Sequence, residues 1–471
     1  MNTSWLLGTL IVYKLVLLGI GYWASRRSGS EADYLLGGRN LGPVVTSISS
    51  VASVASAWVM LALSTAAYRL GMEVFWIFPG TLIGFCINWW WLAPRLRERS
   101  EEVGALTVVD VLTSGIPKRN QTWLRALAVL AILVSFVFYV AAQLQASGVT
   151  FHKNFDLDMA SSVVIGTAIV LAYTLMGGFW AASVTDTLQG LMMLLAATVL
   201  PAMAIVAAGG PAEVIAGAGG WHAVFGEGGS LLFTFGLVAG LMGIGLGALG
   251  QPHVLNRYMA VRSQEALVHA RIIALIWTVL TYGGMILLGW SVKAMVAQGD
   301  WSDGAFGEGV LFVVAEKLLH PIAAGVVVAA VLAAIMSTAD SQLLVASSAI
   351  SHDLRAKKLG RWMSHRFTLL WVGSAACMLA LWLPDSIFSR VMFAWSALGA
   401  AFGPLLVALL AGCRPGAGTR IAAMTVGFFG TVILNALPDG PGDVHERLWP
   451  FLGACLILWF DHKRRGIVPS E

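Results

Sequence analysis

The densest group of side chains with chemical potential in this sequence is the run Ser337-Thr338-Ala339-Asp340-Ser341. On a helix its three hydroxyls fall within roughly one turn, since about 3.6 residues complete a turn. Oxygen atoms are the ligands that a small hard cation prefers. Serine and threonine hydroxyls also bond back to the carbonyls of their own helix, so the hydroxyls alone leave both interpretations open. Asp340 favours a cation site, because an aspartate in an apolar segment needs a partner.

A second acidic residue stands in another apolar segment, in the run Thr185-Asp186-Thr187-Leu188-Gln189. Three roles fit Asp186: a gate, a further ion ligand, or an acid placed near a helix N-terminus by the helix dipole. The chain has no phosphate-binding P-loop and no set of nucleophile, base and orienting residue. The sequence therefore supports neither ATP-driven pumping nor an enzyme.

The elements that must position these residues are apolar throughout. Hydrophobic residues make up 58% of the 471 residues and charged residues 11%, whereas soluble domains carry roughly 25% charged residues. A helix of about 20 apolar residues crosses the roughly 30 Å hydrocarbon layer, and such runs recur from Trp5 to Phe460. We therefore predict an all-α membrane protein with about 13 transmembrane helices. The predicted spans are 5–25, 43–68, 74–93, 122–150, 159–176, 183–208, 231–252, 271–294, 321–350, 367–383, 388–412, 420–437 and 447–461.

The distribution of lysine and arginine predicts the orientation. Cytoplasmic loops of membrane proteins carry an excess of these residues. Most of the 29 basic residues, Arg257 and Arg262 among them, fall in alternate connecting segments that lie inside if the N-terminus is outside. We therefore expect a multi-pass protein of the inner (plasma) membrane with a cytoplasmic C-terminus. The net charge of +4 is explained by this bias and does not indicate nucleic-acid binding.

Two predicted spans contain unusually many small residues. The second contains the serine- and alanine-rich stretch 47–57, and the seventh carries five glycines between positions 240 and 250, followed by Pro252. Broken helices at corresponding positions of two halves are typical of transporters that bind their substrate at the membrane midplane. Close helix packing through small residues is the alternative.

Five segments occur in an order that resembles the sodium:solute symporter family over nearly the whole chain. They are 34–43 (YLLGGRNLGP), 173–181 (YTLMGGFWA), 250–260 (GQPHVLNRYMA), 336–344 (MSTADSQLL) and 400–404 (AAFGP). The resemblance implies a LeuT-like fold of two inverted five-helix repeats. These would occupy 43–208 and 231–412, with an extra N-terminal helix at 5–25 and two C-terminal helices within 420–461, all in one transporter domain.

The resemblance also implies sites, residue by residue. Sodium would be bound by the carbonyls of Ala52, Ala55 and Ala334 and by the hydroxyls of Ser337 and Thr338. The substrate would be bound by Ser56, Ala57, Trp58, Tyr139, Ile244, Ala248 and Pro252, with Gln143 as a further polar group. Asp186, Asp340 and Ser341 are the coupling or gating candidates.

Three departures concern proline-transporting members of the family. Val54 stands where they have an aspartate that serves sodium, and Ile244 and Ala248 stand where a tryptophan and a tyrosine pack the proline ring. Two aromatic faces and a hydroxyl are thereby missing, so the ligand set for proline is incomplete. The expected pocket has no buried arginine, and a carboxylate would rely on helix N-termini.

We therefore predict a sodium-coupled secondary active symporter that works by alternating access. Its solute would be an amino acid or carboxylate of the proline-like class, without proline being the favoured member. A proton-coupled transporter that uses Asp340 or Asp186 is one alternative, motivated by Val54. A membrane sensor that binds solute without transport is another, although only the short basic tail 461–471 follows the last span. The expected partners are the solute, sodium and the lipid bilayer; the oligomeric state is left open, and a monomer would suffice.

Overall fold

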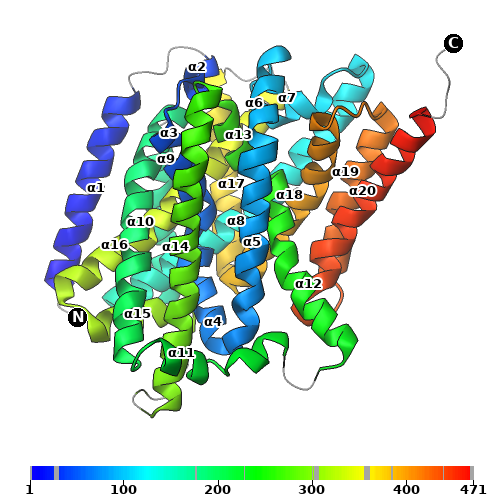
Figure 1. The fold of residues 1–471 in the computed structure, drawn as a ribbon. Helices are drawn as coiled ribbons and strands as arrows, with labels where there is room; N and C mark the ends of the chain where they lie inside the picture. Colours follow the sequence, from blue (N-terminus) through cyan, green and yellow to red (C-terminus); the bar gives the residue numbers. More distant parts are fainter. Residues whose placement is uncertain are drawn as a thin grey trace.

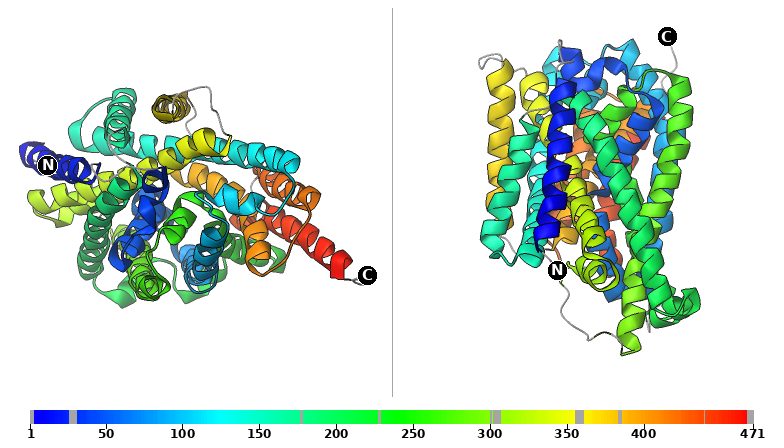
Figure 2. Two further views of the ribbon diagram at one scale, coloured as in Figure 1. Left: turned by 90° about the horizontal axis from the view of Figure 1, so that it is seen from above. Right: turned by 90° about the vertical axis from the view of Figure 1, so that its left-hand side faces the viewer.

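The computed structural model describes residues 3–25, 31–175, 178–226, 229–299, 301, 307–354, 361–382, 386–438 and 440–466. Within them the chain is a bundle of long helices running roughly side by side (Figure 1). The described β-structure is a single bridge between Leu41 and Val261. Viewed along the bundle, α1 lies at one edge and α20 at the opposite edge (Figure 2). An all-α fold is thus what the composition predicted.

The first half of the chain forms α1 (Thr3–Ser25), α2 (Glu31–Leu36), η1 (Gly37–Arg39), α3 (Pro43–Ala57), η2 (Trp58–Leu63), α4 (Ser64–Leu70), η3 (Gly71–Trp76), α5 (Ile77–Cys86), η4 (Ile87–Leu92), α6 (Ala93–Glu102), α7 (Val108–Thr113), α8 (Lys118–Phe155), α9 (Met159–Thr174), α10 (Phe179–Ala207), α11 (Pro211–Gly217) and η5 (Trp221–Phe225). The second half forms α12 (Leu231–Gly247), η6 (Ala248–Gly250), α13 (Pro252–Met259), α14 (Gln264–Ala297), α15 (Val310–Leu318), α16 (Pro321–Ser348), η7 (Ala349–Asp353), α17 (Arg361–Trp382), α18 (Ile387–Leu410), α19 (Ala417–Asn435), η8 (Pro441–Asp443) and α20 (Val444–Gly466).

Each predicted span coincides with a helix or a run of helices, although Met176 and Leu383, the last residues of two of them, lie outside the described residues. Among the described residues, 8 helix runs are long and apolar enough to cross a membrane, and the first of these, Pro43–Glu102, covers two predicted spans. The start of α1 and the end of α20 lie at opposite ends of the bundle (Figure 1), which agrees with an odd number of crossings. The count of thirteen stays a prediction.

Part of the small-residue content serves close packing. Gly80 and Gly84 of α5 face the backbone of α12, and an added Cβ at either position would overlap Met242 or Gly245. Gly240 is packed in the same way against Gly442. Small residues let helix backbones approach closely, so the packing explanation holds for these glycines.

Candidate functional site

Two of the long helices are interrupted in the middle of the bundle. In α3 the backbone leaves helical geometry at Ser56, with φ 9° and ψ −172°. In the seventh predicted span, α12 ends at Gly247, a short 3-10 turn follows, and Gln251 is extended with φ −85° and ψ 102° before α13 begins at Pro252. An interruption releases backbone groups from the helix ladder. The breaks expected from sequence are therefore present in both spans.

The hydroxyls of α16 lie against the broken part of α3. Ser337 Oγ is 3.3 Å from the carbonyl oxygen of Ala52 and 3.2 Å from that of Ala334. Thr338 Oγ1 is 2.9 Å from the carbonyl oxygen of Ser53. The two side chains are completely buried. Four of the five implied sodium ligands thus meet at one place.

Two details of this oxygen group differ from the set implied by resemblance. The carbonyl that Thr338 reaches belongs to Ser53, which the sequence analysis did not name. Ala55 is buried in the same segment, just before the break at Ser56. Val54 is also buried there, and its carbonyl accepts a hydrogen bond from Trp58 Nε1 at 3.1 Å. Val54 therefore takes part in the polar contacts at the break through its backbone carbonyl and not through its side chain.

A buried ion pair lies beside this oxygen group. Arg257 Nη2 is 2.5 Å from Asp186 Oδ2 and donates to Ser341 Oγ at 2.8 Å, while Nε donates to Ser49 Oγ at 3.1 Å. Arg257 is 1% exposed and lies in the short helix α13, between two predicted spans, so its burial was not expected from the sequence. Neither buried charge is isolated, which is the condition for placing charges in an apolar interior.

Asp186 is not an acid of a helix N-terminus. Helix α10 begins at Phe179 and has no acidic residue in its first turn. The first turn is where the helix dipole acts most strongly, so that alternative is wrong. Asp186 instead joins α10 to α13 through Arg257.

Ser53 connects the oxygen group with the ion pair. Its carbonyl accepts from Thr338, and its hydroxyl donates to Asp186 Oδ2 at 3.3 Å and lies 3.3 Å from Ser341 Oγ. Ser341 in turn donates to Asp340 Oδ1 at 3.3 Å. The three coupling candidates Asp186, Asp340 and Ser341 are therefore neighbours, and one residue of α3 contacts both groups.

Four of the implied substrate residues meet at the break in α3. Gln143 Oε1 accepts from the backbone N–H of Ala57 at 3.0 Å, and Gln143 Nε2 donates to Ser56 Oγ at 3.4 Å. Tyr139 Oη lies 3.5 Å from both Ser56 Oγ and the carbonyl of Val54. Helix α8 thus supplies hydrogen-bond partners to backbone groups that the break leaves outside the helix ladder.

Aromatic rings surround Trp58, which follows the break. Its ring contacts Tyr282 and Phe388 edge-on, with centroids 5.5 Å and 6.3 Å away. The sequence analysis named neither partner, because they come from α14 and α18, far from Trp58 in the chain. These rings form an apolar wall next to the Gln143 group.

Two of the three implied substrate residues of the seventh span accept hydrogen bonds from neighbouring helices through their backbone carbonyls. Trp395 donates through Nε1 to the carbonyl of Ile244 at 2.7 Å, and the carbonyl of Ala248 accepts from Asn88 Nδ2 at 2.8 Å. Pro252 is the first residue of α13. Trp395 therefore holds the end of α12 in place. The sequence feature that could have indicated this contact is a tryptophan, Trp395, within the segment 394–403 of mostly small residues.

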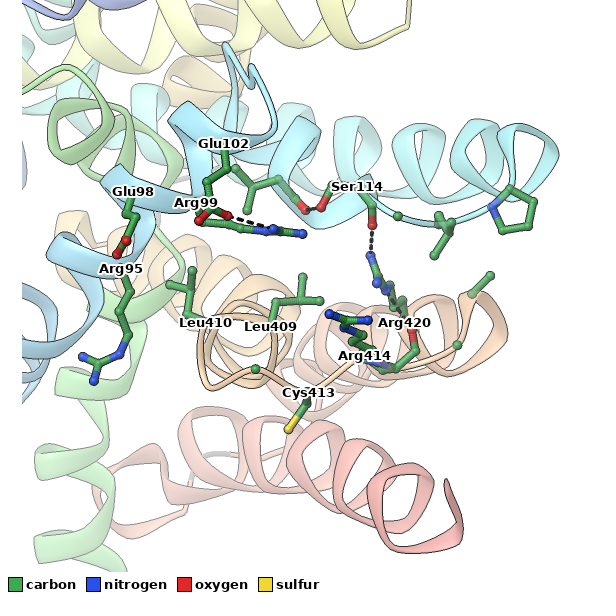
Figure 3. Close-up of a pocket in the computed structure, with 18 residues that line it drawn as sticks. Arg95, Glu98, Arg99, Glu102, Ser114, Leu409, Leu410, Cys413, Arg414 and Arg420 are labelled. Carbon is green, nitrogen blue, oxygen red and sulfur yellow. Dashed lines mark hydrogen bonds and ion pairs between the residues drawn. The ribbon is translucent and has the colours of Figure 1, made fainter. Parts of the chain in front are cut away.

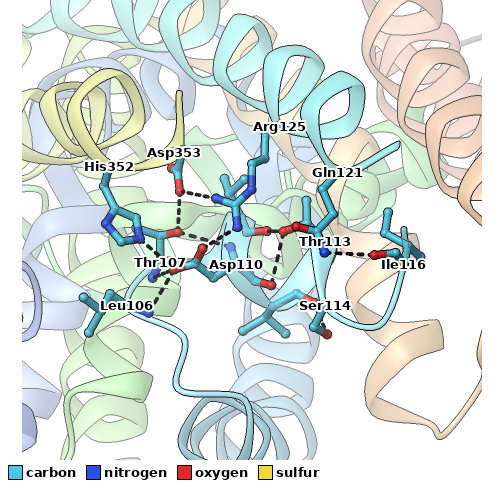
Figure 4. Close-up of polar contacts among 12 residues, drawn as sticks. Leu106, Thr107, Asp110, Thr113, Ser114, Ile116, Gln121, Arg125, His352 and Asp353 are labelled. Carbon is cyan, nitrogen blue, oxygen red and sulfur yellow. Dashed lines mark hydrogen bonds and ion pairs between the residues drawn. The ribbon is translucent and has the colours of Figure 1, made fainter. Parts of the chain in front are cut away.

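Charged side chains of α7, α8 and η7 form a cluster (Figure 4), and Glu31 of α2 contacts it. His352 contacts Asp110 at 2.9 Å and Glu31 at 3.0 Å, while Arg125 contacts Asp110 at 2.7 Å and Asp353 at 3.5 Å. Burial raises the pKa of Asp110, but the hydrogen bond and charge of His352 and those of Arg125 outweigh it, so this pKa lies well below its usual range. Ligand atoms of Asp110, His352 and Asp353 lie within 4.8 Å of one another, as a metal site requires. The Arg125 guanidinium already pairs with the carboxylates of Asp110 and Asp353. We therefore interpret the cluster as an ion-pair network and not as a metal site.

Known proteins resemble this one over most of its length. The model of the sodium:solute symporter family matches residues 34–417. A sodium/proline symporter of Salmonella typhimurium is 36% identical over 437 residues, which are 90% of this chain and 86% of the relative. A high-affinity proline transporter of Bacillus subtilis is 34% identical, with 94% and 95% of the two chains covered. A solved Na⁺-coupled sialic acid symporter in a substrate-bound outward-open state matches 99% of both chains with a TM-score of 0.79 at 17% identity.

Proposed function

Because the chain belongs to the sodium:solute symporter family, we propose that the oxygens of Ala52, Ser53, Ala55, Ala334, Ser337 and Thr338 bind its coupling sodium ion. The protein is a sodium-coupled solute symporter with a LeuT-like fold, a multi-pass protein of the plasma membrane and not an enzyme.

The oxygen–oxygen distances at the α3 break support the sodium site. Between α16 and α3 they are 3.3 Å from Ser337 Oγ to the Ala52 carbonyl and 2.9 Å from Thr338 Oγ1 to the Ser53 carbonyl, and within α16 Ser337 Oγ is 3.2 Å from the Ala334 carbonyl. Oxygens that share a hard cation at about 2.4 Å lie roughly 3.4 Å apart at right angles, so a sodium ion needs only a small outward shift of these groups. All of them are buried, so no water competes from the surface.

Sodium-dependent uptake in proteoliposomes tests this site. A hydrogen-bond acceptor to a charged group contributes about 1.5–3 kcal/mol, so Ser337→Ala or Thr338→Ala should raise the sodium concentration for half-maximal uptake about tenfold or more. Matched controls are Ser291→Ala and Thr431→Ala, whose hydroxyls bond to their own helices. Uptake that responds equally to sodium in all four variants would contradict the site.

Ser53 offers a physical route from sodium binding to gating. An ion between α3 and α16 would draw the Ser53 carbonyl toward itself, and the Ser53 hydroxyl contacts Asp186 and Ser341. The Asp186–Arg257 pair holds α10 to α13. Sodium occupancy is thereby linked to the contact between these helices, as alternating access requires. Arg257 balances the charge of Asp186, so the counter-charge of this carboxylate is the guanidinium and not the sodium ion.

The substrate we propose is a small amino acid or carboxylate of the class to which proline belongs. Arg257 is engaged by Asp186, so it does not serve a substrate carboxylate. The N–H groups of Ala57 and Trp58 already donate to Gln143 Oε1 and Ser56 Oγ. The donors for a carboxylate at the break are therefore the side chains of Ser56, Tyr139 and Gln143. Ile244 and Ala248 supply no aromatic face, although Trp58, Tyr282 and Phe388 do.

A thermal-shift screen distinguishes the substrates. Ligands that bind only the folded state raise its apparent stability, by about 2.7 kcal/mol at a hundredfold excess over Kd. Purified protein is compared in sodium and in potassium with a panel of amino acids and small carboxylates. We expect a sodium-dependent shift that is larger for another member than for proline. Proline as the strongest ligand would refute the argument from Ile244 and Ala248.

For the orientation we propose an outside N-terminus and a cytoplasmic C-terminus, and a monomer suffices for the site. The excess of lysine and arginine in alternate connecting segments supports this orientation. A C-terminal fluorescent protein that folds only in the cytoplasm checks it. Fluorescence from the C-terminal fusion is expected, and a dark but inserted fusion would reverse the orientation.

A further inference from the structure

A cavity of about 790 Å³ lies away from the oxygen group, between the α6–α7 segment and the loop that joins α18 to α19 (Figure 3). Charged side chains line much of it. They are Arg95, Arg99, Arg414, Arg420, Glu98 and Glu102. Four guanidinium groups against two carboxylates leave an excess of positive charge.

Three of the arginines point into the same space (Figure 3). Arg420 is 4% exposed and donates to the backbone carbonyls of Leu112, Ser114 and Pro415. Arg99 pairs with Glu102 at 3.0 Å, and Arg414 stands exposed on the opposite wall. Arginine forks of this kind match the oxygens of a phosphate group.

Two helix N-termini add positive potential to the same cavity. Helix α8 starts after Pro117 and has no side-chain cap, and α19 starts after Gly416, whose N–H donates to Asp461; both Pro117 and Gly416 line the cavity. Uncapped N–H groups and the positive end of the helix dipole favour an anion. The arginines and the helix ends therefore select the same kind of ligand.

The cavity lies at the level where membrane meets water. The N–H of Gly416 donates to Asp461 at 3.3 Å, which places the end of α20 beside the cavity. Just before it, Trp459 is 52% exposed, and Lys463 Nζ lies 5.3 Å from the centre of its ring. Arg95 lies over the Trp91 ring at 4.7 Å on the other side. Exposed tryptophan with lysine or arginine is typical of the interface with lipid headgroups.

We propose that this cavity binds the phosphate headgroup of an anionic phospholipid. Basic pockets between transmembrane helices bind such headgroups, with about 1 kcal/mol per lysine or arginine. The bound headgroup connects the α6–α7 segment with the α18–α19 loop, two parts of the bundle that are far apart in sequence. The start of α8, which has no side-chain cap, also faces the headgroup.

The test uses delipidated full-length protein in detergent with added phosphatidylglycerol or phosphatidylcholine. Native mass spectrometry counts bound lipid, and thermal unfolding reports stabilisation. Arg414→Glu changes an exposed loop residue of the cavity, and Arg262→Glu changes an exposed arginine outside it. Sodium-dependent uptake in phosphatidylcholine vesicles verifies that both variants fold. Inorganic phosphate at millimolar concentration is the soluble-anion arm.

We expect wild type and Arg262→Glu to retain phosphatidylglycerol and not phosphatidylcholine. Arg414→Glu should weaken retention at least fivefold, the factor to which about 1 kcal/mol corresponds. Equal retention in all three proteins overturns the proposal, as does equal retention of the two lipids. Stabilisation by inorganic phosphate that equals that of phosphatidylglycerol also overturns it, because the ligand would then be a soluble anion.

Discussion

The buried ion pair of Asp186 and Arg257 gives the sharpest test of the core geometry. Arg257→Gln removes the guanidinium that contacts Asp186, Ser341 and Ser49 and leaves the carboxylate without this cation. Removing one partner of a buried pair costs about 3–5 kcal/mol, whereas replacing both charges is often nearly neutral. We therefore expect Asp186→Asn/Arg257→Gln to be more stable than either single variant.

Thermal unfolding in one detergent, followed by tryptophan fluorescence, measures the effect. The entropy of unfolding is about 2.1 cal/mol/K per residue, so for a chain of 471 residues each kcal/mol corresponds to about 1 °C. Either single variant should lower Tm by about 3–5 °C, and the double variant by about 1 °C. Additive losses in the double variant would refute the reasoning, because additivity means that the two side chains do not interact.

Three further outcomes are expected. Gly247→Ala should destabilise the fold by about 1–3 kcal/mol or more, because the added Cβ would overlap the Trp395 ring. Gly418→Ala is the control, since a Cβ at position 418 meets nothing within 4 Å, and thermal unfolding of both variants measures the difference. Because the pKa of Asp110 is lowered in the folded protein, its ion pairs stabilise the fold above about pH 4, and this stabilisation is lost as the pH falls below that value. Asp110→Asn should therefore have a lower free energy of unfolding at pH 7, and this free energy should change less between about pH 3 and pH 6 than in the wild type. Gln143→Leu leaves a buried N–H without its acceptor at a cost of about 1–3 kcal/mol, so the KM for solute should rise about fivefold or more in uptake kinetics, and an unchanged KM would remove this residue from the pocket.

The interruptions of α3 and α12 could be predicted because their causes are local. The stretch 47–57 is rich in small polar residues, and the seventh span combines glycines with Pro252, which cannot continue a helix ladder. Their exact positions, Ser56 and Gln251, depend on what packs around them. Gln143 of α8 accepts the Ala57 N–H at one break, and Trp395 fixes the end of α12 before the other.

Arg257 shows where local reading fails. A basic residue near the end of a span has the sequence signature of a cytoplasmic segment, which gives no indication that its side chain is buried. Whether this arginine is buried depends on Asp186, which lies 71 positions earlier in the chain. Nothing in the neighbourhood of either residue reveals that distant partner.

The sequence by itself determined the apolar helical bundle, the hydroxyl cluster at Ser337 and Thr338 and the family resemblance, because hydrophobicity and residue type are properties of the chain. Only the tertiary structure decided that Thr338 faces the carbonyl of Ser53, that Ser53 also contacts Asp186, and that Arg257 is buried. These are contacts between α3, α10, α13 and α16, and they exist only when distant segments pack together. The physical reason is that a buried charge or a released carbonyl selects its partner by proximity in space, which the order of residues does not encode locally.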